Sequence, residues 1–208
     1  MLSRRSLLAA AITLPNLPPG DALRFRLIRE GSMIGVHELR FKRRPEGVVI
    51  AIHVDIAVRL GPIVFYRYKL SASETWQDGE CVAASSRTDD DGKRLFMQAL
   101  RGSRRLTVTG TGIQPYVAPA GAFVASHWNP AELHGPWINL QNGALLRPRV
   151  EALGPDPVLV ANGSRVAASC FSVTGPVRMR LWYTPARVWT GLLFRASDNS
   201  MVRYERVL

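Results

Sequence analysis

The chain has 208 residues, of which 47% are hydrophobic and 21% are charged. This balance is typical of a globular protein and excludes an extended disordered chain, which needs low hydrophobicity and high charge. The formal net charge is +11, but the basic residues stand in short groups beside turn residues rather than along one stripe. We therefore expect no nucleic-acid partner, and only weak affinity for anionic envelope surfaces.

Residues 1–22 have the pattern of a secretory signal peptide. Arg4 and Arg5 precede a short apolar run at residues 7–14, which prolines and a glycine follow. The run is too short to span a bilayer, and the paired arginines are typical of the twin-arginine route, with the general secretory route as the alternative. The pattern predicts an exported, periplasmic protein that does not span the membrane; a disordered or helical cytosolic tail is the other interpretation.

From residue 23 onward, apolar residues alternate with polar ones, which is the period of a half-buried β-strand. Between residues 48 and 60 every even position is apolar, whereas the odd positions include His53, Asp55 and Arg59. The same alternation continues from Val64 to Trp76. We predict strands near residues 23–30, 33–43, 48–60, 63–76, 80–88, 93–100, 104–110, 145–152, 165–174, 177–184, 187–196 and 201–207.

Turn sequences separate these runs at the spacing of hairpins. Asp78-Gly79 and Asp91-Gly92 supply the left-handed backbone that tight hairpin turns require. Residues 110–142 are less regular, with one short strand expected at 121–128 and a turn of helix near 130–134. The prediction for residues 23–208 is one all-β domain: a large curved antiparallel meander sheet, or a closed or half-open barrel, of about ten to twelve strands.

The candidate ligand site lies on one face of the fourth predicted strand. By alternation, three aromatic residues and one acid share that face: Tyr66, Tyr68, Glu74 and Trp76. His37 occupies an apolar face of the second strand. A buried carboxylate must be paired, hydrogen-bonded or raised in pKa. Glu74 is therefore either in an ion pair with an inward arginine, Arg178 or Arg180, or the polar anchor of an aromatic-lined pocket.

Motifs of catalysis and cofactor binding are scarce. The sequence has no glycine-flanked serine elbow, phosphate-binding glycine loop or dinucleotide fingerprint. His127, Glu132 and His134 are the nearest approach to a metal-ligand cluster, and their position in an irregular segment favours ordinary loop residues. We predict no catalytic residues, no metal and no cofactor. Export would permit a disulfide between Cys81 and Cys170; two free thiols are the alternative.

Four motifs give the chain a resemblance to a known family. They extend over most of residues 23–208: Gly31-x-x-Ile34-Gly35-x-His37, Glu74-x-Trp76-x-x-Gly79, Thr88-x-x-Asp91-Gly92 and Trp182-Tyr183. With them the chain resembles a family of exported bacterial proteins that is known only as a domain of unknown function. The resemblance implies a curved antiparallel sheet, loosely similar to periplasmic lipoprotein-carrier folds, and no established activity. Members often have an aspartate after the Trp-Tyr pair, where this chain has Thr184.

The leading hypothesis is a non-catalytic envelope protein whose curved sheet shelters a small apolar or amphipathic, lipid-like molecule. Five residues would line that site: His37, Tyr66, Tyr68, Glu74 and Trp76. One alternative is an enzyme acting on envelope lipids or glycans, with Glu74 and a histidine as acid and base. Another is a structural module that docks a second envelope protein through its basic surface.

Overall fold

The structure is a computed structural model that describes residues 17–208. Its main element is a thirteen-stranded sheet with the strand order β12-β15-β16-β17-β18-β1-β2-β3-β4-β5-β6-β7-β8. The predicted all-β class and curved antiparallel meander are confirmed, with the sheet left open between the edge strands β12 and β8. Residues 1–16, which carry most of the predicted signal peptide, lie outside the described residues.

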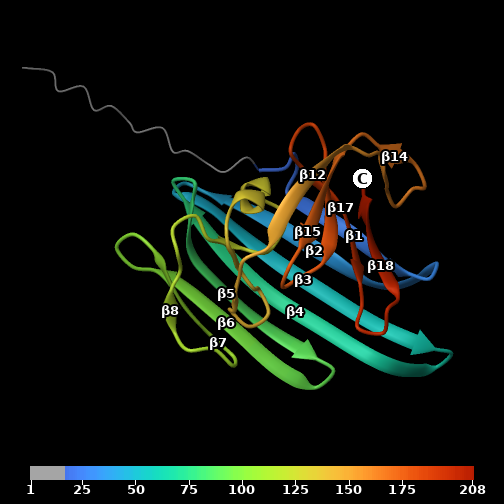
Figure 1. Cartoon of the computed structure of the whole chain (residues 1–208), viewed down its shortest axis with the longest axis horizontal. Coiled ribbons are helices and arrows are strands. Elements are labelled where there is room, and N and C mark those ends of the chain that lie inside the picture. Colours follow the sequence, from blue (N-terminus) through green and yellow to red (C-terminus); the bar gives the residue numbers. More distant parts are fainter. Residues whose placement is uncertain (1–16) are drawn as a thin grey trace, which may run out of the picture.

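Long strands form the middle of the sheet and lie side by side in Figure 1: β1 (Ala22–Arg29), β2 (Ser32–Arg44), β3 (Gly47–Leu60), β4 (Ile63–Gln77), β5 (Glu80–Asp90) and β6 (Lys93–Arg101). Shorter strands complete both ends: β7 (Leu106–Gly110), β8 (Tyr116–Val117), β12 (Arg149–Pro155), β15 (Ser169–Thr174), β16 (Met179–Tyr183), β17 (Trp189–Arg195) and β18 (Met201–Val207). The last strand, β18, pairs antiparallel with β1. The first and last strands of the chain are therefore neighbours in the middle of the sheet.

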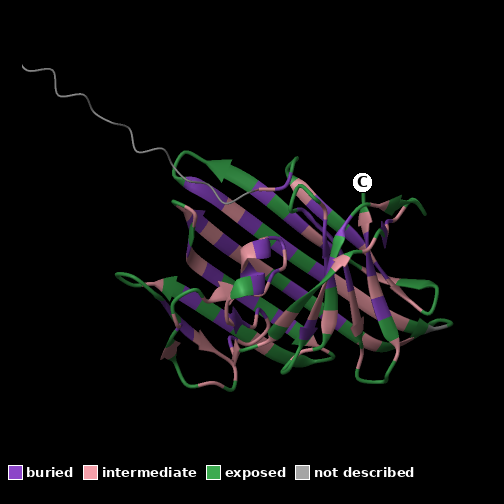
Figure 2. Ribbon diagram, turned by 45° about the horizontal axis from the view of Figure 1, so that its top comes forward, coloured by how far each residue is buried: buried purple, intermediate pink, exposed green. Residues whose placement is uncertain are grey.

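Alternation places the buried apolar side chains of each long strand on the concave side. In β3, Ile50, Ile52 and Val54 are buried, whereas Ala51 and His53 are exposed. Figure 2 shows this as bands of buried and exposed residues that alternate along the strands. The hairpin turn between β5 and β6 is formed by Asp91 at φ 51° and Gly92 at φ 89°, both in the left-handed region.

The irregular segment between β8 and β12 packs against the concave face and fills part of it. It contains β9 (Phe123–Val124), the 3-10 helix η1 (Pro130–His134), β10 (Trp137–Ile138) and β11 (Leu145–Leu146). Trp128 is fully buried, with its ring 5.6 Å from that of Phe41 and 5.2 Å from that of Trp76. The expected turn of helix is confirmed, whereas the strand expected at 121–128 is limited to Phe123–Val124. The parallel pairing of β9 with β10 was not predicted.

Two of the predicted strands are wrong in their extent, because each is split. Residues 145–152 divide into β11 and β12 at Pro148, which cannot donate a ladder hydrogen bond. Residues 165–174 divide into β14 (Arg165–Val166) and β15, since β14 pairs with β13 (Val158–Leu159) in a separate small sheet. No helix within residues 17–208 has the length and hydrophobicity needed to cross a bilayer.

The disulfide that export would permit is absent. Cys81 and Cys170 are both free and buried. Cys81 belongs to the main cluster of buried apolar residues, whereas Cys170 packs in a second cluster with Val158, Ala168 and Trp182. Because the two thiols lie in different clusters, the fold keeps them apart.

Candidate functional site

A cavity of about 650 Å³ lies between strands β2–β4 and strands β16–β18. Residues 125–146 of the irregular segment form another part of its wall. The lining is mainly aliphatic and aromatic: Ile34, Val54, Ile56, Val58, Leu70, Trp137, Leu140, Leu146, Met179, Leu192, Phe194 and Val202. The cavity reaches the surface at the turn between β17 and β18, where Ser197 and Asp198 are exposed. Its size and composition are those of a small-molecule site.

Three of the five predicted site residues line this cavity: His37, Tyr66 and Tyr68. The hydroxyl of Tyr66 donates to Oδ1 of Asp90 at 2.6 Å, and Nε2 of Gln141 donates to the hydroxyl of Tyr68 at 3.0 Å. Burial raises the pKa of Tyr68 to about 12. Both phenols are therefore neutral polar groups set into an apolar wall.

Glu74 and Trp76, the other two predicted residues, do not line the cavity but lie in the filled part of the interior. Glu74 is fully buried, and its Oε2 accepts hydrogen bonds from the indole nitrogens of Trp76 at 2.7 Å and Trp128 at 3.2 Å. Burial raises the pKa of Glu74. The predicted ion pair is wrong, because Arg178 and Arg180 are both exposed.

The register of β4 explains why Glu74 stays inward. A bulge interrupts the pairing of β4 with β5 between Thr75 and Trp76, so that Val82 of β5 is left unpaired. The extra residue belongs to β5 and not to β4, so the alternation within β4 is preserved. Neither of the hydrogen bonds to Glu74 comes from a histidine, so the acid–base pairing of the enzyme alternative is not present.

His37 is a buried polar residue of the cavity wall. Its ring packs against Phe25, Trp189 and Tyr204, with centroid distances of 6.2, 5.3 and 5.7 Å. Neither ring nitrogen has a hydrogen-bond partner within the described part of the chain. Burial, with smaller contributions from His127 and His53, lowers the pKa of His37 to about 3. The residue is therefore a neutral ring at physiological pH.

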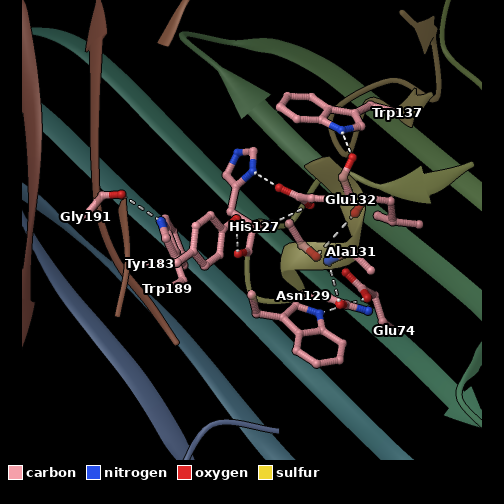
Figure 3. A network of polar contacts seen from close by, with 12 residues as sticks. Glu74, His127, Asn129, Ala131, Glu132, Trp137, Tyr183, Trp189 and Gly191 are labelled. Atoms are coloured by element: carbon pink, nitrogen blue, oxygen red, sulfur yellow. Dashed lines mark hydrogen bonds and ion pairs between the residues drawn. The ribbon is translucent and has the colours of Figure 1, made fainter. Parts of the chain in front are cut away.

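A second histidine, His127, also lines the cavity and is held by a carboxylate (Figure 3). Its Nδ1 lies 2.6 Å from Oε1 of Glu132, whose side chain is 1% exposed. The backbone N–H of His127 donates to the other oxygen of Glu132 at 3.0 Å. In the sequence, His127 and Glu132 were connected only through a weak metal-ligand pattern that also included His134. In the structure His134 is exposed. Within residues 17–208, no three His, Cys, Asp or Glu side chains are grouped as metal ligands.

Charged groups stand at the outer end of the cavity. Arg29, at the end of β1, forms an ion pair with Asp198, and its Nε donates to Oγ of Ser200 at 2.7 Å. These contacts join β1 to the turn between β17 and β18. The cavity therefore has an apolar body, two histidines in its buried wall and an ion pair beside the solvent-facing turn.

Comparisons with known proteins agree with this architecture. The model of a family described as a domain of unknown function, DUF6134, matches residues 25–207. No curated protein matches the sequence. Among solved structures, the chain is similar to a β-barrel-like protein of the domain of unknown function DUF1849 from Brucella abortus, with a TM-score of 0.61 and 9% identity over 95% of this chain and 98% of that one. The likeness concerns the fold alone. By its match over nearly the whole described length, the chain belongs to the DUF6134 family.

Proposed function

We propose that the protein is a non-catalytic binding module that shelters a small apolar or amphipathic molecule, such as a lipid, in the cavity under its curved sheet. The observation that carries this proposal is the cavity of about 650 Å³, whose lining is mostly aliphatic and aromatic. Natural ligand sites have this volume range and the same combination of an apolar wall with a few placed polar groups.

The partial filling of the interior also supports binding. Trp128 occupies one part of the concave side and packs between Phe41 and Trp76, so the core does not depend on the other part being filled. The other part stays hollow and is lined by side chains such as Val54 and Leu70. Removing apolar ligand surface from water favours binding by about 25 cal/mol per Å² of buried area.

The cellular setting that we propose is the periplasm. The basic start and short apolar run before residue 15 are those of an export signal. An exported lipid binder of this shape would keep an apolar molecule out of water. Mass spectrometry of the protein recovered from its own cells tests the export step, because signal cleavage would remove the residues before about position 23.

The alternatives have weaker support. The enzyme alternative required Glu74 beside a histidine, and Glu74 instead accepts hydrogen bonds from two indoles. The docking alternative required one exposed apolar patch rimmed by arginine. Exposed apolar residues are instead distributed over the strands β2, β4, β6, β8 and β12: Met33, Ile63, Phe65, Phe96, Leu100, Val117 and Leu153.

A matched pair of substitutions on β3 tests the binding proposal. Ile56 lines the cavity, and the next residue, Ala57, has its side chain on the opposite face of the strand. Ile56→Trp fills the cavity, so we expect at least a tenfold loss of affinity for the neutral fluorescent probe N-phenyl-1-naphthylamine. Ala57→Trp adds similar bulk outside and should leave that affinity unchanged.

Native mass spectrometry of the protein purified from its own cells gives the second measurement. A retained mass in the lipid range that Ile56→Trp abolishes and Ala57→Trp keeps would support the proposal. A protein that carries no ligand and binds the probe equally well in both variants would refute it. Circular dichroism checks that both variants keep the β-sheet.

A further inference from the structure

The orientation of His127 is fixed by more contacts than a loop histidine needs. Its backbone lies in the left-handed region at φ 67°, which is unfavourable for a residue other than glycine. Its N–H donates to Glu132, and its C=O accepts from the hydroxyl of Tyr183 at 2.9 Å. Its ring lies edge-on between Trp137 and Trp189, each 5.6 Å away between centroids. Strained residues that are held this firmly tend to be functional.

Glu132 is itself held in place by η1, the 3-10 helix that carries it. The side chain of Asn129 caps this helix by accepting from the N–H of Ala131 at 3.1 Å, and the indole of Trp137 donates to the backbone oxygen of Glu132 at 2.7 Å. Figure 3 shows these contacts together with the ring of His127. The carboxylate therefore positions the imidazole from a rigid support.

These contacts leave one nitrogen of His127 for the cavity. A carboxylate accepts hydrogen bonds, so Nδ1 carries the hydrogen and donates it to Glu132. In the neutral ring, Nε2 is then a hydrogen-bond acceptor. It has no hydrogen-bond partner within the described residues, and His127 is one of the residues that line the cavity. The side chain is 12% exposed.

We propose that the His127–Glu132 pair is the polar anchor of the cavity and selects amphipathic molecules whose head group donates an O–H hydrogen bond. The alkyl part of such a molecule would lie along Val54, Ile56 and Leu70, and its hydroxyl would donate to Nε2 of His127. This inference rests on the proposed function and adds the chemistry of the ligand's head group. Fatty alcohols and monoglycerides have that chemistry.

Two probe molecules of equal size separate a donor head from an acceptor head. 1-Decanol and nonyl methyl ether have the same number of heavy atoms, but only the alcohol can donate a hydrogen bond. Each is titrated against protein loaded with N-phenyl-1-naphthylamine, and the displacement constant is measured. We expect the alcohol to bind about tenfold more tightly to the wild-type protein, which corresponds to one buried hydrogen bond.

Two substitutions of histidine locate the source of this preference. His127→Asn tolerates the left-handed backbone but removes the imidazole, so the alcohol and the ether should bind with equal affinity. His134→Asn changes the exposed histidine at the end of helix η1 and should keep the tenfold preference. Glu132→Gln tests the positioning role of the carboxylate and should reduce the preference without abolishing binding.

The outcomes distinguish this inference from the proposed function. Equal affinities in the wild-type protein, or a preference that survives in His127→Asn, would overturn the anchor and leave the apolar cavity as a binding site. Failure of both molecules to displace the probe would contradict both proposals. If His127→Asn loses its β-sheet signal in circular dichroism, the test depends on two other results. These are the ratio of alcohol to ether affinity in the wild-type protein and the same ratio in Glu132→Gln.

Discussion

The imidazole of His37 lies edge-on against the indole of Trp189, with the ring centroids 5.3 Å apart and the planes at 71°. Both nitrogens of the imidazole are buried without a hydrogen-bond partner within residues 17–208. A neutral ring is tolerated in this position, whereas an imidazolium would lose its hydration without replacement. For this reason burial lowers the pKa of His37 from 6.5 to about 3.

The first prediction is that the contribution of His37 to the free energy of unfolding falls as the pH is lowered from about 6.5 toward 3. In this window the unfolded chain protonates His37 and the folded chain does not, so protons favour the unfolded state. The loss approaches about 1.4 kcal/mol per pH unit from this residue alone. Urea unfolding at several pH values measures it.

The matched variants for this prediction are His37→Phe and His53→Phe. His37→Phe replaces the buried imidazole by an apolar ring and should flatten the acid slope of stability. His53 stands on the exposed face of β3, so His53→Phe should keep the slope of the wild-type protein. An unchanged slope in His37→Phe would show that other groups cause the acid sensitivity.

The second prediction concerns Glu74 and has the opposite sign. Its raised pKa means that the folded chain holds a proton which the unfolded chain releases above about pH 4.5. The contribution of Glu74 to stability therefore declines as the pH rises from 4.5 through its folded-state pKa, and up to about pH 6.5 it opposes the contribution of His37. Glu74→Gln keeps an oxygen acceptor for the indoles of Trp76 and Trp128 and should remove this decline in urea unfolding measured between pH 5 and 8.

Glu74→Leu distinguishes the contribution of the two indole hydrogen bonds to stability from the contribution of the titration of Glu74. Leucine leaves the two indole N–H groups buried without an acceptor, each at a cost of about 1–3 kcal/mol. We expect a loss of at least 2 kcal/mol at all pH values, against less than about 1 kcal/mol for Glu74→Gln near pH 5. Equal stability of the leucine and glutamine variants would mean that the indole hydrogen bonds contribute little.

The strand pattern could be predicted from the sequence because its cause is local. Alternation along β3 and β4 and the Asp91-Gly92 turn each depend on neighbouring residues, and they placed Tyr66 and Tyr68 on the correct face. The inward direction of Glu74 followed from the same alternation. The hydrogen-bond partners of Glu74 could not be predicted in the same way. Trp128 is 54 residues away in the sequence, in an irregular segment that has no periodic pattern of apolar residues.

The histidine–carboxylate pair was missed for a related reason. His127 and Glu132 are only five residues apart, but their contact depends on the left-handed backbone of His127 and on the 3-10 helix that follows. The available signal was Asn129-Pro130, an N-cap and a proline at the first helical position, with Glu132 three residues after Asn129. That signal indicates a short helix, but it does not say which ring the carboxylate will meet.

The third prediction concerns the thiols. Cys81 and Cys170 are free, and burial raises the pKa of both. Buried, protonated thiols react slowly, because the thiolate is the nucleophile. Ellman's reagent should therefore detect two thiols in denaturant and far less than two in the folded protein over the same time. A reductant should leave the thermal unfolding midpoint unchanged; a fall in that midpoint would reveal a disulfide.

The fourth prediction uses two glycines of the first hairpin motif. A Cβ on Gly35 would lie 2.2 Å from the backbone oxygen of Asp55 and 2.9 Å from Cα of Ile56, both on the neighbouring strand β3. Neither atom belongs to a flexible side chain, so Gly35→Ala must push β2 away from β3 beside the cavity. We expect a loss of about 2 kcal/mol or more in urea unfolding, together with weaker probe binding, because Ile34 and Ile56 line the cavity wall there.

Gly31 provides the control for this substitution. It lies in the turn before β2 at φ 80°, and a Cβ built on it meets no atom within 4 Å. Gly31→Ala therefore introduces only backbone strain of about 1 kcal/mol and should leave probe binding unchanged. If the two alanine variants lost equal stability and both kept probe affinity, the close approach of β2 to β3 would not be what shapes this side of the cavity. A larger loss in Gly35→Ala, with weaker binding, would show that this spacing sets the cavity wall.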